Sequence, residues 1–151
     1  MDKRISKFRF TKNNTGYLLA QALKTWNELL YHEFCLAGFP EVRPSYGAIL
    51  IPLFDEEGLG LKELGDRAGL SKQTMTTMVR NLETCNLVKR KHSPHDGRFH
   101  LLFLTPKGQR LKAAAIKIIP ALEGKISKAL PDDFNGDMKA FLKNFRDLTK
   151  F

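Results

Sequence analysis

The chain has 151 residues and a net charge of +9, and 42% of its residues are hydrophobic. This length can bury a core without a disulfide or metal staple, and the two cysteines, Cys35 and Cys85, give no disulfide framework. The sequence shows no secretory leader and no apolar run long enough to span a bilayer, so we expect a cytoplasmic protein with no membrane partner.

The positive charge is concentrated in two segments of the chain. Residues 1–15 carry a net charge of +4 and residues 61–110 a net charge of +6, whereas residues 16–60 carry −4. Clustered Lys and Arg residues attract nucleic acid, although such a cluster can also be ordinary solvated surface. The secondary structure of the charged segments is needed to choose between these two interpretations.

Residues 1–14 are polar and basic and predict a loose arm. Apolar residues at helical spacing follow and predict a long amphipathic helix, with capping candidates Asn14 and Thr15 at its start and Gly38 at its end. The apolar stripe of this helix comprises Leu19, Ala22, Leu23, Trp26, Leu29, Leu30 and Phe34.

A second helix is expected over residues 44–58, with a kink at Pro52. The residues after it predict a helix, a tight turn and another helix. The short helix covers residues 61–68 and ends at Gly69, which suits a left-handed cap, and Ser71 suits the N-cap of the helix that follows.

The helix after Ser71 has two different faces. Its apolar stripe consists of Met75, Met78, Val79 and Leu82. The opposite face carries short hydrogen-bonding side chains, which can enter a major groove and read base edges, whereas a plain solvated face seldom holds so many threonines. The predicted DNA-contacting residues of this helix are Ser71, Lys72, Gln73, Thr74, Thr76, Thr77 and Arg80.

Two β-rich runs, residues 87–92 and 98–105, are joined by a turn that contains Pro94 and Gly97. They predict a β-hairpin directly after the pair of helices, which is the position of the wing in a winged helix. Its cationic residues would contact the phosphate backbone, and one arginine would enter the minor groove. The predicted DNA-contacting residues of the hairpin are Lys89, Arg90, Lys91 and Arg98.

Two more amphipathic helices are expected after the hairpin. The first opens at Thr105 and Pro106 and bends at Pro120, and the second is capped by Asp132 or Asp133. The apolar faces of the terminal helices exceed what the central module needs for its own core. We therefore expect them to pair in a homodimer, which would also supply two copies of the reading helix.

Residues 61–108 resemble the multiple antibiotic resistance regulator (MarR) family. The matching features are Ser71 at the start of the recognition helix, Leu82 with Glu83 before the first wing strand, Asp96 with Arg98 at the wing tip, and the exit Leu104, Thr105, Pro106, Lys107 and Gly108. The helices on either side follow the same order, so the resemblance covers nearly the whole chain.

The resemblance implies an α-rich homodimer that binds double-stranded DNA, usually represses genes and often releases DNA when a small, commonly aromatic, effector binds. It also implies that Arg98 enters the minor groove and that Asp96 stabilises the wing. Phe99 departs from the family pattern, because many relatives carry a second arginine there.

Other sites have a functional and a plainer interpretation. An effector could use aromatic and polar side chains, but these are more often core, and the ligand-binding residues stay unknown. The candidate side chains are Trp26, Tyr31, His32, Phe34 and Tyr46. A metal site on the hairpin is disfavoured, because its donors lie on a mobile turn without a cysteine; those donors are His92, His95, Asp96 and His100. No cofactor is expected.

Three alternatives concern the class of function. A regulator that senses oxidants through Cys35 or Cys85 would need an activated thiol, and neither residue has an obvious neighbouring base. A winged helix that binds only proteins would not need a basic hairpin. An enzyme is not expected, because the sequence holds no phosphate-binding loop, nucleophile elbow or HExxH motif.

The predicted fold class is therefore mainly α with a small β-hairpin wing. It is a winged helix-turn-helix with amino- and carboxy-terminal dimerisation helices. Residues 1–40 would form the arm and the first dimerisation helix, residues 41–105 the DNA-binding lobe, and residues 106–151 the remaining dimerisation helices. The predicted function is a DNA-binding regulator of transcription that represses from a pseudo-palindromic operator.

Overall fold

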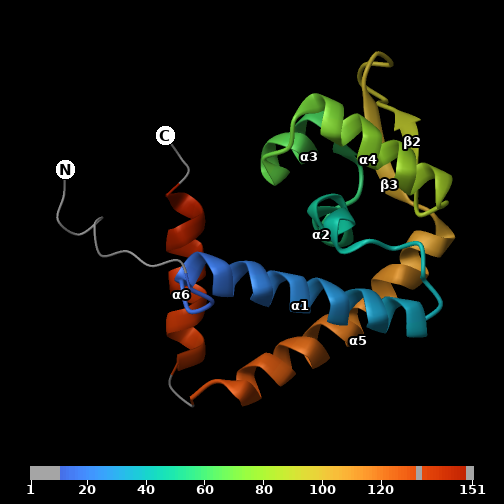
Figure 1. The fold of residues 1–151 in the computed structure, drawn as a ribbon. Coiled ribbons are helices and arrows are strands. Elements are labelled where there is room, and N and C mark those ends of the chain that lie inside the picture. The colour runs from blue at the N-terminus through green and yellow to red at the C-terminus, as the bar shows by residue number, and fades with distance from the viewer. Residues whose placement is uncertain (1–10, 132–133, 149–151) are drawn as a thin grey trace, which may run out of the picture. The chain divides into compact units, whose positions relative to one another are not determined.

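The computed structural model describes residues 11–131 and 134–148. Within these residues, the chain up to Pro44 and the chain from Ser45 onward form two compact units. The roles predicted for residues 1–40, 41–105 and 106–151 stay a prediction. The first unit contains α1 (Thr15–Leu36). The remaining elements are a 3-10 helix (Pro44–Tyr46), α2 (Gly47–Asp55), β1 (Leu59–Gly60), α3 (Leu61–Ala68), α4 (Lys72–Thr84), β2 (Val88–His92), β3 (His100–Leu104), α5 (Pro106–Ala129) and α6 (Phe134–Asp147), as Figure 1 shows.

Helix α1 begins where its sequence predicted, after Asn14. The Asn14 side chain makes no cap hydrogen bond to the helix, because its Oδ1 accepts from the backbone N–H of Thr11 instead. The chain leaves the helix through Gly38, whose φ of 87° lies in the left-handed region that favours glycine. Of the predicted apolar stripe only Phe34 is buried, so most of this stripe lies on the surface of a single chain.

The predicted second helix, residues 44–58, is wrong in its first turn and at its end, because α2 ends at Asp55. Residues Pro44–Tyr46 form a 3-10 turn, and α2 proper begins at Gly47. Pro52 lies inside α2 and Pro120 inside α5, and both helices continue past the proline. The bend expected at each proline stays a prediction.

In the second unit, α3 packs against both α2 and α4, and all three helices pack against the sheet. The short helix α3 ends at Gly69, whose φ of 63° confirms the predicted left-handed cap. The fully buried side chains of this unit come from helices, strands and the turns between them: Ile49, Leu53, Leu64, Val79, Leu82, Leu87, Leu102 and Leu111. The helix, tight turn and helix are confirmed.

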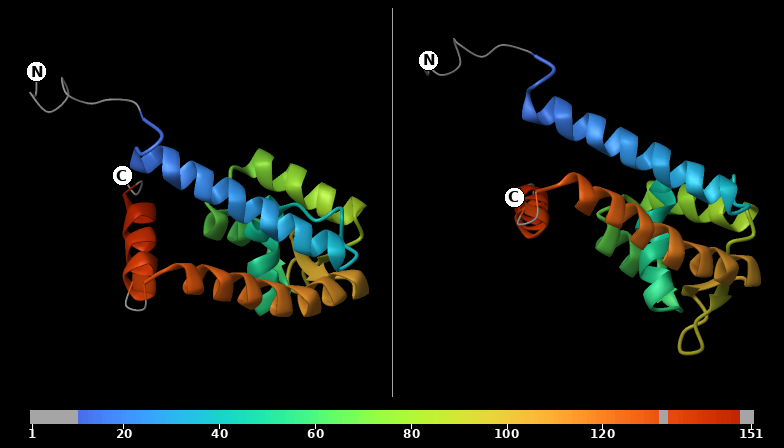
Figure 2. Two further views of the ribbon diagram at one scale, coloured as in Figure 1. Left: turned by 60° about the horizontal axis from the view of Figure 1, so that its bottom comes forward. Right: turned by 90° about the horizontal axis from the view of Figure 1, so that it is seen from below.

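The sheet has three antiparallel strands in the order β1-β3-β2. The hairpin β2–β3 was predicted, and its register pairs Val88 with Leu104 and His92 with His100. Strand β1 was missed: Leu59 and Gly60 pair with Leu102 and Leu101 on the other edge of β3. The loop between β2 and β3 projects beyond the helices of its unit, as Figure 1 and the right-hand view of Figure 2 show.

Helix α5 opens as its sequence predicted. Thr105 is the N-cap, its side chain accepts a hydrogen bond from the backbone N–H of Gly108, and Pro106 is the first helical residue. The predicted cap of α6 at Asp132 or Asp133 lies outside the described residues. Within residues 11–131 and 134–148, no helix has both the length and the apolar character needed to cross a bilayer.

Candidate nucleic-acid interface

Local bonding fixes the start of helix α4. The hydroxyl of Ser71, the N-cap residue, accepts a hydrogen bond of 3.2 Å from the backbone N–H of Thr74. The turn before it is closed by a 3.0 Å bond from the backbone N–H of Leu70 to the carbonyl of Gly65. Because these bonds use donors and acceptors that a helix end leaves free, they set the angle between α3 and α4.

Helix α4 keeps its two faces separate. Met75, Val79 and Leu82 are buried, and Met78 is half-buried. The polar residues predicted to contact DNA are all exposed: Ser71, Lys72, Gln73, Thr74, Thr76, Thr77 and Arg80. The apolar stripe therefore anchors α4, and the surface of these seven polar residues, the reading face, is open to a large partner.

Three of the four threonines of α4 bond back to carbonyls of their own helix. The Thr76 hydroxyl donates to the Lys72 carbonyl at 2.8 Å, and the Thr77 hydroxyl donates to the Gln73 carbonyl at 3.1 Å. Thr84, one turn beyond Arg80, does the same with the Arg80 carbonyl at 2.9 Å. A threonine in a helix populates two rotamers, and a hydrogen bond from its hydroxyl to the carbonyl four residues earlier favours one of them. These bonds therefore fix the rotamers of the three side chains.

The cationic residues of β2 are not equivalent. Lys89 is exposed. The guanidinium of Arg90 forms two bonds to the carboxylate of Glu83 at the end of α4, of 2.9 Å and 2.7 Å. The ammonium of Lys91 lies 4.7 Å from the centre of the Phe103 ring, a cation–π contact. Arg90 and Lys91 are therefore already engaged within the protein, and a phosphate would compete with those contacts.

The tip of the hairpin is organised by Asp96 and Arg98. The Asp96 carboxylate accepts bonds from the Arg98 backbone N–H at 3.0 Å and from its guanidinium at 3.1 Å and 3.0 Å. These side-chain and backbone bonds hold the pKa of Asp96 below its ordinary value, and Asp96 raises the pKa of Arg98. The Arg98 side chain is nevertheless 87% exposed, so its charge faces solvent at the tip.

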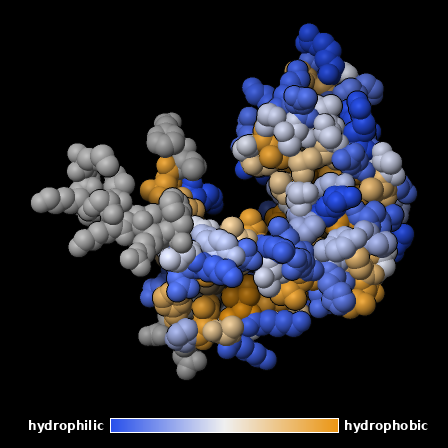
Figure 3. Space-filling model, in the orientation of Figure 1, coloured by the Kyte–Doolittle hydropathy of each residue, from blue (hydrophilic) through white to orange (hydrophobic). Residues whose placement is uncertain are grey.

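The surface over the hairpin is mainly hydrophilic, as Figure 3 shows in blue. Near the tip, Nδ1 of His92 lies 2.8 Å from the carbonyl oxygen of Gly97, and the rings of His92 and His100 are 4.5 Å apart. Among the described residues, no three His, Cys, Asp or Glu side chains gather in a way that could hold a metal ion.

The base of the hairpin is anchored by residues that sequence reasoning missed. The Glu57 carboxylate accepts a 2.9 Å bond from the backbone N–H of Leu104 and a further bond from Gln109. Asn86 has a φ of 56°, and its carbonyl accepts from the Thr105 hydroxyl. Asn at the end of a helix is a known left-handed cap and could have been found from the sequence, whereas Glu57 carries no such signal.

The packing around Gly108 explains why the exit motif ends in glycine. A Cβ atom at this position would lie 2.1 Å from the carbonyl oxygen of Leu87 and 3.2 Å from the Leu104 side chain. No other residue type fits so close to the hairpin. The motif is therefore a packing requirement that holds the start of α5 against the base of β2 and β3.

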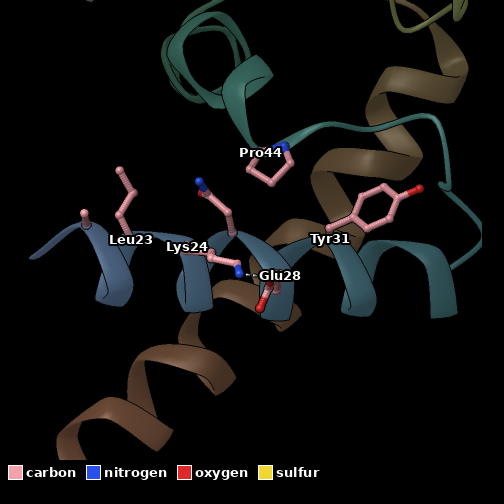
Figure 4. A pocket seen from close by; sticks show the side chains of 7 residues that line it. Leu23, Lys24, Glu28, Tyr31 and Pro44 are labelled. Carbon is pink, nitrogen blue, oxygen red and sulfur yellow. Dashed lines mark ion pairs between the residues drawn. The ribbon is translucent and has the colours of Figure 1, made fainter. Parts of the chain in front are cut away.

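A shallow cavity of about 480 Å³, largely open to solvent, lies along α1. Its lining residues are Ala20, Leu23, Lys24, Asn27, Glu28, Tyr31 and Pro44, and Figure 4 shows the Lys24–Glu28 ion pair beside it. Of the side chains expected as candidates for an effector site, only Tyr31 lines this cavity: Phe34 and Tyr46 are buried, Trp26 is half-buried and His32 is exposed elsewhere.

Both cysteines are free and half-buried. Cys35 forms a side-chain hydrogen bond with Tyr31 that raises the pKa of the phenol. The Tyr31 hydroxyl also donates to the Pro40 carbonyl at 3.1 Å. The backbone carbonyl of Cys85 accepts a 3.0 Å bond from the Lys107 ammonium, so Cys85 takes part in a contact between the end of α4 and the start of α5.

Comparison with known proteins places the chain in a family. Residues 44–100 match the family model described as MarR family. The transcriptional regulator HosA of Escherichia coli O111:H- is 34% identical over 107 residues, which cover 71% of this chain and 76% of HosA. The chain belongs to the MarR family.

Another relative, the HTH-type transcriptional regulator TtmR of Methylorubrum extorquens (strain PA1), is 41% identical over 69 residues, which cover 46% of this chain. The match spans only 35% of the length of TtmR. Among solved structures, the transcriptional repressor CouR bound to a 23-mer DNA duplex superimposes with a TM-score of 0.77 at 24% identity, covering 92% of this chain and 99% of CouR.

Membership of the MarR family confirms the resemblance predicted from residues 61–108. The fold class, mainly α with a winged helix-turn-helix, is confirmed as well. So is the class of function, a DNA-binding regulator of transcription, because the relatives matched are transcriptional regulators.

Proposed function

We propose that the chain binds double-stranded DNA as a homodimer and represses transcription from a pseudo-palindromic operator. The reading face of α4 enters the major groove, and the β2–β3 hairpin lies over the adjoining phosphates with Arg98 directed to the minor groove. The observation that carries this proposal is the exposure of the whole reading face beside a hydrophilic, cationic hairpin.

A duplex must contact the reading face of α4 and the β2–β3 hairpin at the same time, and the local structure supports such a contact. Buried residues of α4 and the bonds at the base of the hairpin hold the two elements in one unit. Asp96 holds Arg98 at the tip while leaving the guanidinium largely exposed. Arginine at such a position suits a narrow minor groove, where the negative potential is strongest.

The homodimer is supported by apolar surface that a single chain leaves open. On α6 and just beyond it the exposed side chains are Phe134, Phe141, Leu142, Phe145 and Leu148, with exposed fractions between 44% and 68%. Burial of each large apolar side chain contributes roughly 1.5–3 kcal/mol, so a stripe of this length favours a partner. A second copy brings a second reading face, as a two-fold symmetric operator requires.

A small aromatic effector that releases DNA belongs to the same proposal. The cavity along α1 has a volume of about 480 Å³ but is largely open to solvent, so it would cover only one side of a small molecule. Its mixture of Leu23, Tyr31 and the Lys24–Glu28 pair suits a ring with a polar substituent. Redox sensing by Cys35 or Cys85 is the alternative trigger, and a peroxide that released DNA from wild type but not from a Cys35→Ser variant would favour it.

No catalytic role is proposed, because the matched relatives are transcriptional regulators. We place the protein's action in the cytoplasm on the basis of its DNA target.

The test is duplex binding measured by fluorescence anisotropy over a range of salt concentrations. If a dimer neutralises roughly eight phosphates, log K should fall against log salt with a slope of about −7. Selection of bound duplexes from a random pool should then return two half-sites with centres about ten base pairs apart. A protein that binds no duplex at low salt is instead the protein-interaction module, and the proposal fails.

A further inference from the structure

The hydroxyl of Thr77 lies near the middle of the reading face, and its proton is already in use. Gln73, Thr77 and Arg80 follow one another at helical spacing on the side opposite the buried stripe. The Thr77 O–H donates to the Gln73 carbonyl at 3.1 Å. A hydroxyl has a single proton, so what this side chain offers outward is an acceptor oxygen and a methyl group.

We propose that Thr77 discriminates against guanine at the base it faces, and selects a base edge that presents an amino group or a methyl group. This inference rests on the proposed function, because it assumes that α4 lies in the major groove. It concerns one position of the half-site and names the chemistry that this position must show.

The base edges differ in the groups they present in the major groove. Guanine presents two acceptors, N7 and O6, whereas adenine and cytosine present amino donors and thymine presents its C5 methyl group. An acceptor oxygen on Thr77 pairs with an amino group, and the methyl group packs against that of thymine. Guanine would place lone pairs against the Thr77 oxygen, or the hydroxyl would have to release the Gln73 carbonyl.

Thr76 adds the same chemistry at the flank of the face. Its hydroxyl donates to the Lys72 carbonyl at 2.8 Å, so it too is left as an acceptor. Two neighbours of Thr77 on the reading face differ from it. Gln73 has an amide with donors and an acceptor, which suits adenine, and Arg80 has only donors, which suit guanine. A guanine in the half-site should therefore face Arg80 rather than Thr77.

Two substitutions separate the hydroxyl from the methyl group. Thr77→Val keeps the branched shape and both methyl-sized groups but removes the acceptor, and Thr77→Ser keeps the hydroxyl but removes the methyl. Thr84→Val is the matched control, because Thr84 makes the same bond to the Arg80 carbonyl, at 2.9 Å, near the carboxyl end of α4. The base edges are read by the amino-terminal residues of a recognition helix, so this control should leave base preference unchanged.

The experiment measures affinity for a set of duplexes in which each base pair of a selected half-site is changed in turn, symmetrically in both halves. The position read by Thr77 is the one whose preference changes in Thr77→Val or Thr77→Ser. At that position wild type should bind the guanine duplex about three- to tenfold more weakly than the best base, as expected for one hydrogen bond. Replacing thymine by uracil at that position removes the C5 methyl group. The replacement should weaken binding by wild type and leave binding by the Thr77→Ser variant unchanged.

The outcomes separate this inference from the proposed function. If guanine is the preferred base at the Thr77 position, or if neither variant changes any preference, the inference is wrong while DNA binding stands. If Thr84→Val alters preference as much as Thr77→Val does, the effect belongs to helix stability and the inference is also wrong. If no duplex binds at all, the proposed function fails first.

Discussion

Arg90 on β2 and Glu83 on α4 form a two-pronged ion pair, with N–O distances of 2.9 Å and 2.7 Å. It joins the end of α4 to the first strand of the hairpin, and both side chains are about one-third exposed. A guanidinium held in this way stabilises the angle between helix and wing by less than about 1 kcal/mol, since solvent screens the pair.

We therefore expect Lys89 and Arg90 to behave differently on substitution. Lys89→Ala should flatten the salt dependence of duplex binding by about one unit of slope for each phosphate that is no longer neutralised, because an exposed lysine can meet a phosphate. Arg90→Ala should leave the slope nearly unchanged and lower the free energy of unfolding slightly. Equal slopes for the two variants, both shallower than that of wild type, would show that Arg90 leaves Glu83 when DNA binds.

Arg98 should contribute to affinity more than to stability. Its side chain is 87% exposed and bonds only within the tip, so Arg98→Ala removes little packing. Operator binding should weaken by a factor of roughly 5 to 150, while the urea midpoint stays close to that of wild type. Titration of a labelled operator checks the loss of affinity. An unchanged affinity removes the wing from the binding surface.

Asp96 should titrate below the usual range of aspartate. Bonds from the Arg98 side chain and backbone lower its pKa in the folded protein, so the ordered tip is fully present above the unfolded pKa. That order is lost only as pH falls through the lower, folded pKa. A carbon-detected NMR titration of the carboxylate should give a midpoint below that of a free aspartate. In an Arg98→Ala variant the midpoint should move back up.

Gly108 and Gly124 both lie in α5 and provide a matched pair. Gly108→Ala would force a Cβ to 2.1 Å from the Leu87 carbonyl oxygen and should destabilise the fold by about 1–3 kcal/mol or more. Gly124 has nothing within 4 Å of its would-be Cβ, so Gly124→Ala should stabilise the helix by about 0.5–1 kcal/mol. Urea unfolding measures both. A tolerated alanine at position 108 would contradict the packing described.

The α6 stripe should control assembly. Phe141 and Phe145 lie with ring centroids 6.0 Å apart on an exposed apolar face, so Phe145→Asp places a charge where a partner would bury the ring. Sedimentation at micromolar concentration should show dimer for wild type and a shift to monomer for this variant. The control variant Lys143→Asp places an aspartate on the other side of α6, and this variant should stay dimeric. Monomeric wild type would contradict the homodimer.

Much of this structure could be predicted from the sequence, because local rules decide it. The caps at Ser71 and Thr105 and the left-handed turn at Gly69 depend on residues a few positions apart. The separation of buried Val79 from exposed Thr77 follows from helical periodicity alone. These features place the reading face, which is why the candidate interface could be predicted before the fold was known.

Features that depend on distant parts of the chain could not be predicted. Strand β1 has only two residues, and it exists because Leu59 meets Leu102 across the sheet. Glu57 and Arg90 look like ordinary surface charges until their partners, Leu104 and Glu83, are brought beside them. The stripe of α1 could be predicted, but not that Phe34 alone would be buried within one chain.

The position of β3 between two other strands limits how the wing can move. Backbone bonds between β3 and β1 would have to break before the base of the hairpin could slide, and the bonds between β3 and β2 keep the two strands of the hairpin together. Residues 93–99 are joined only by short-range bonds, such as that from the Ser93 backbone N–H to the Phe99 carbonyl at 2.8 Å. Under the proposed function, the tip could then adapt to minor grooves of different width without displacing α4.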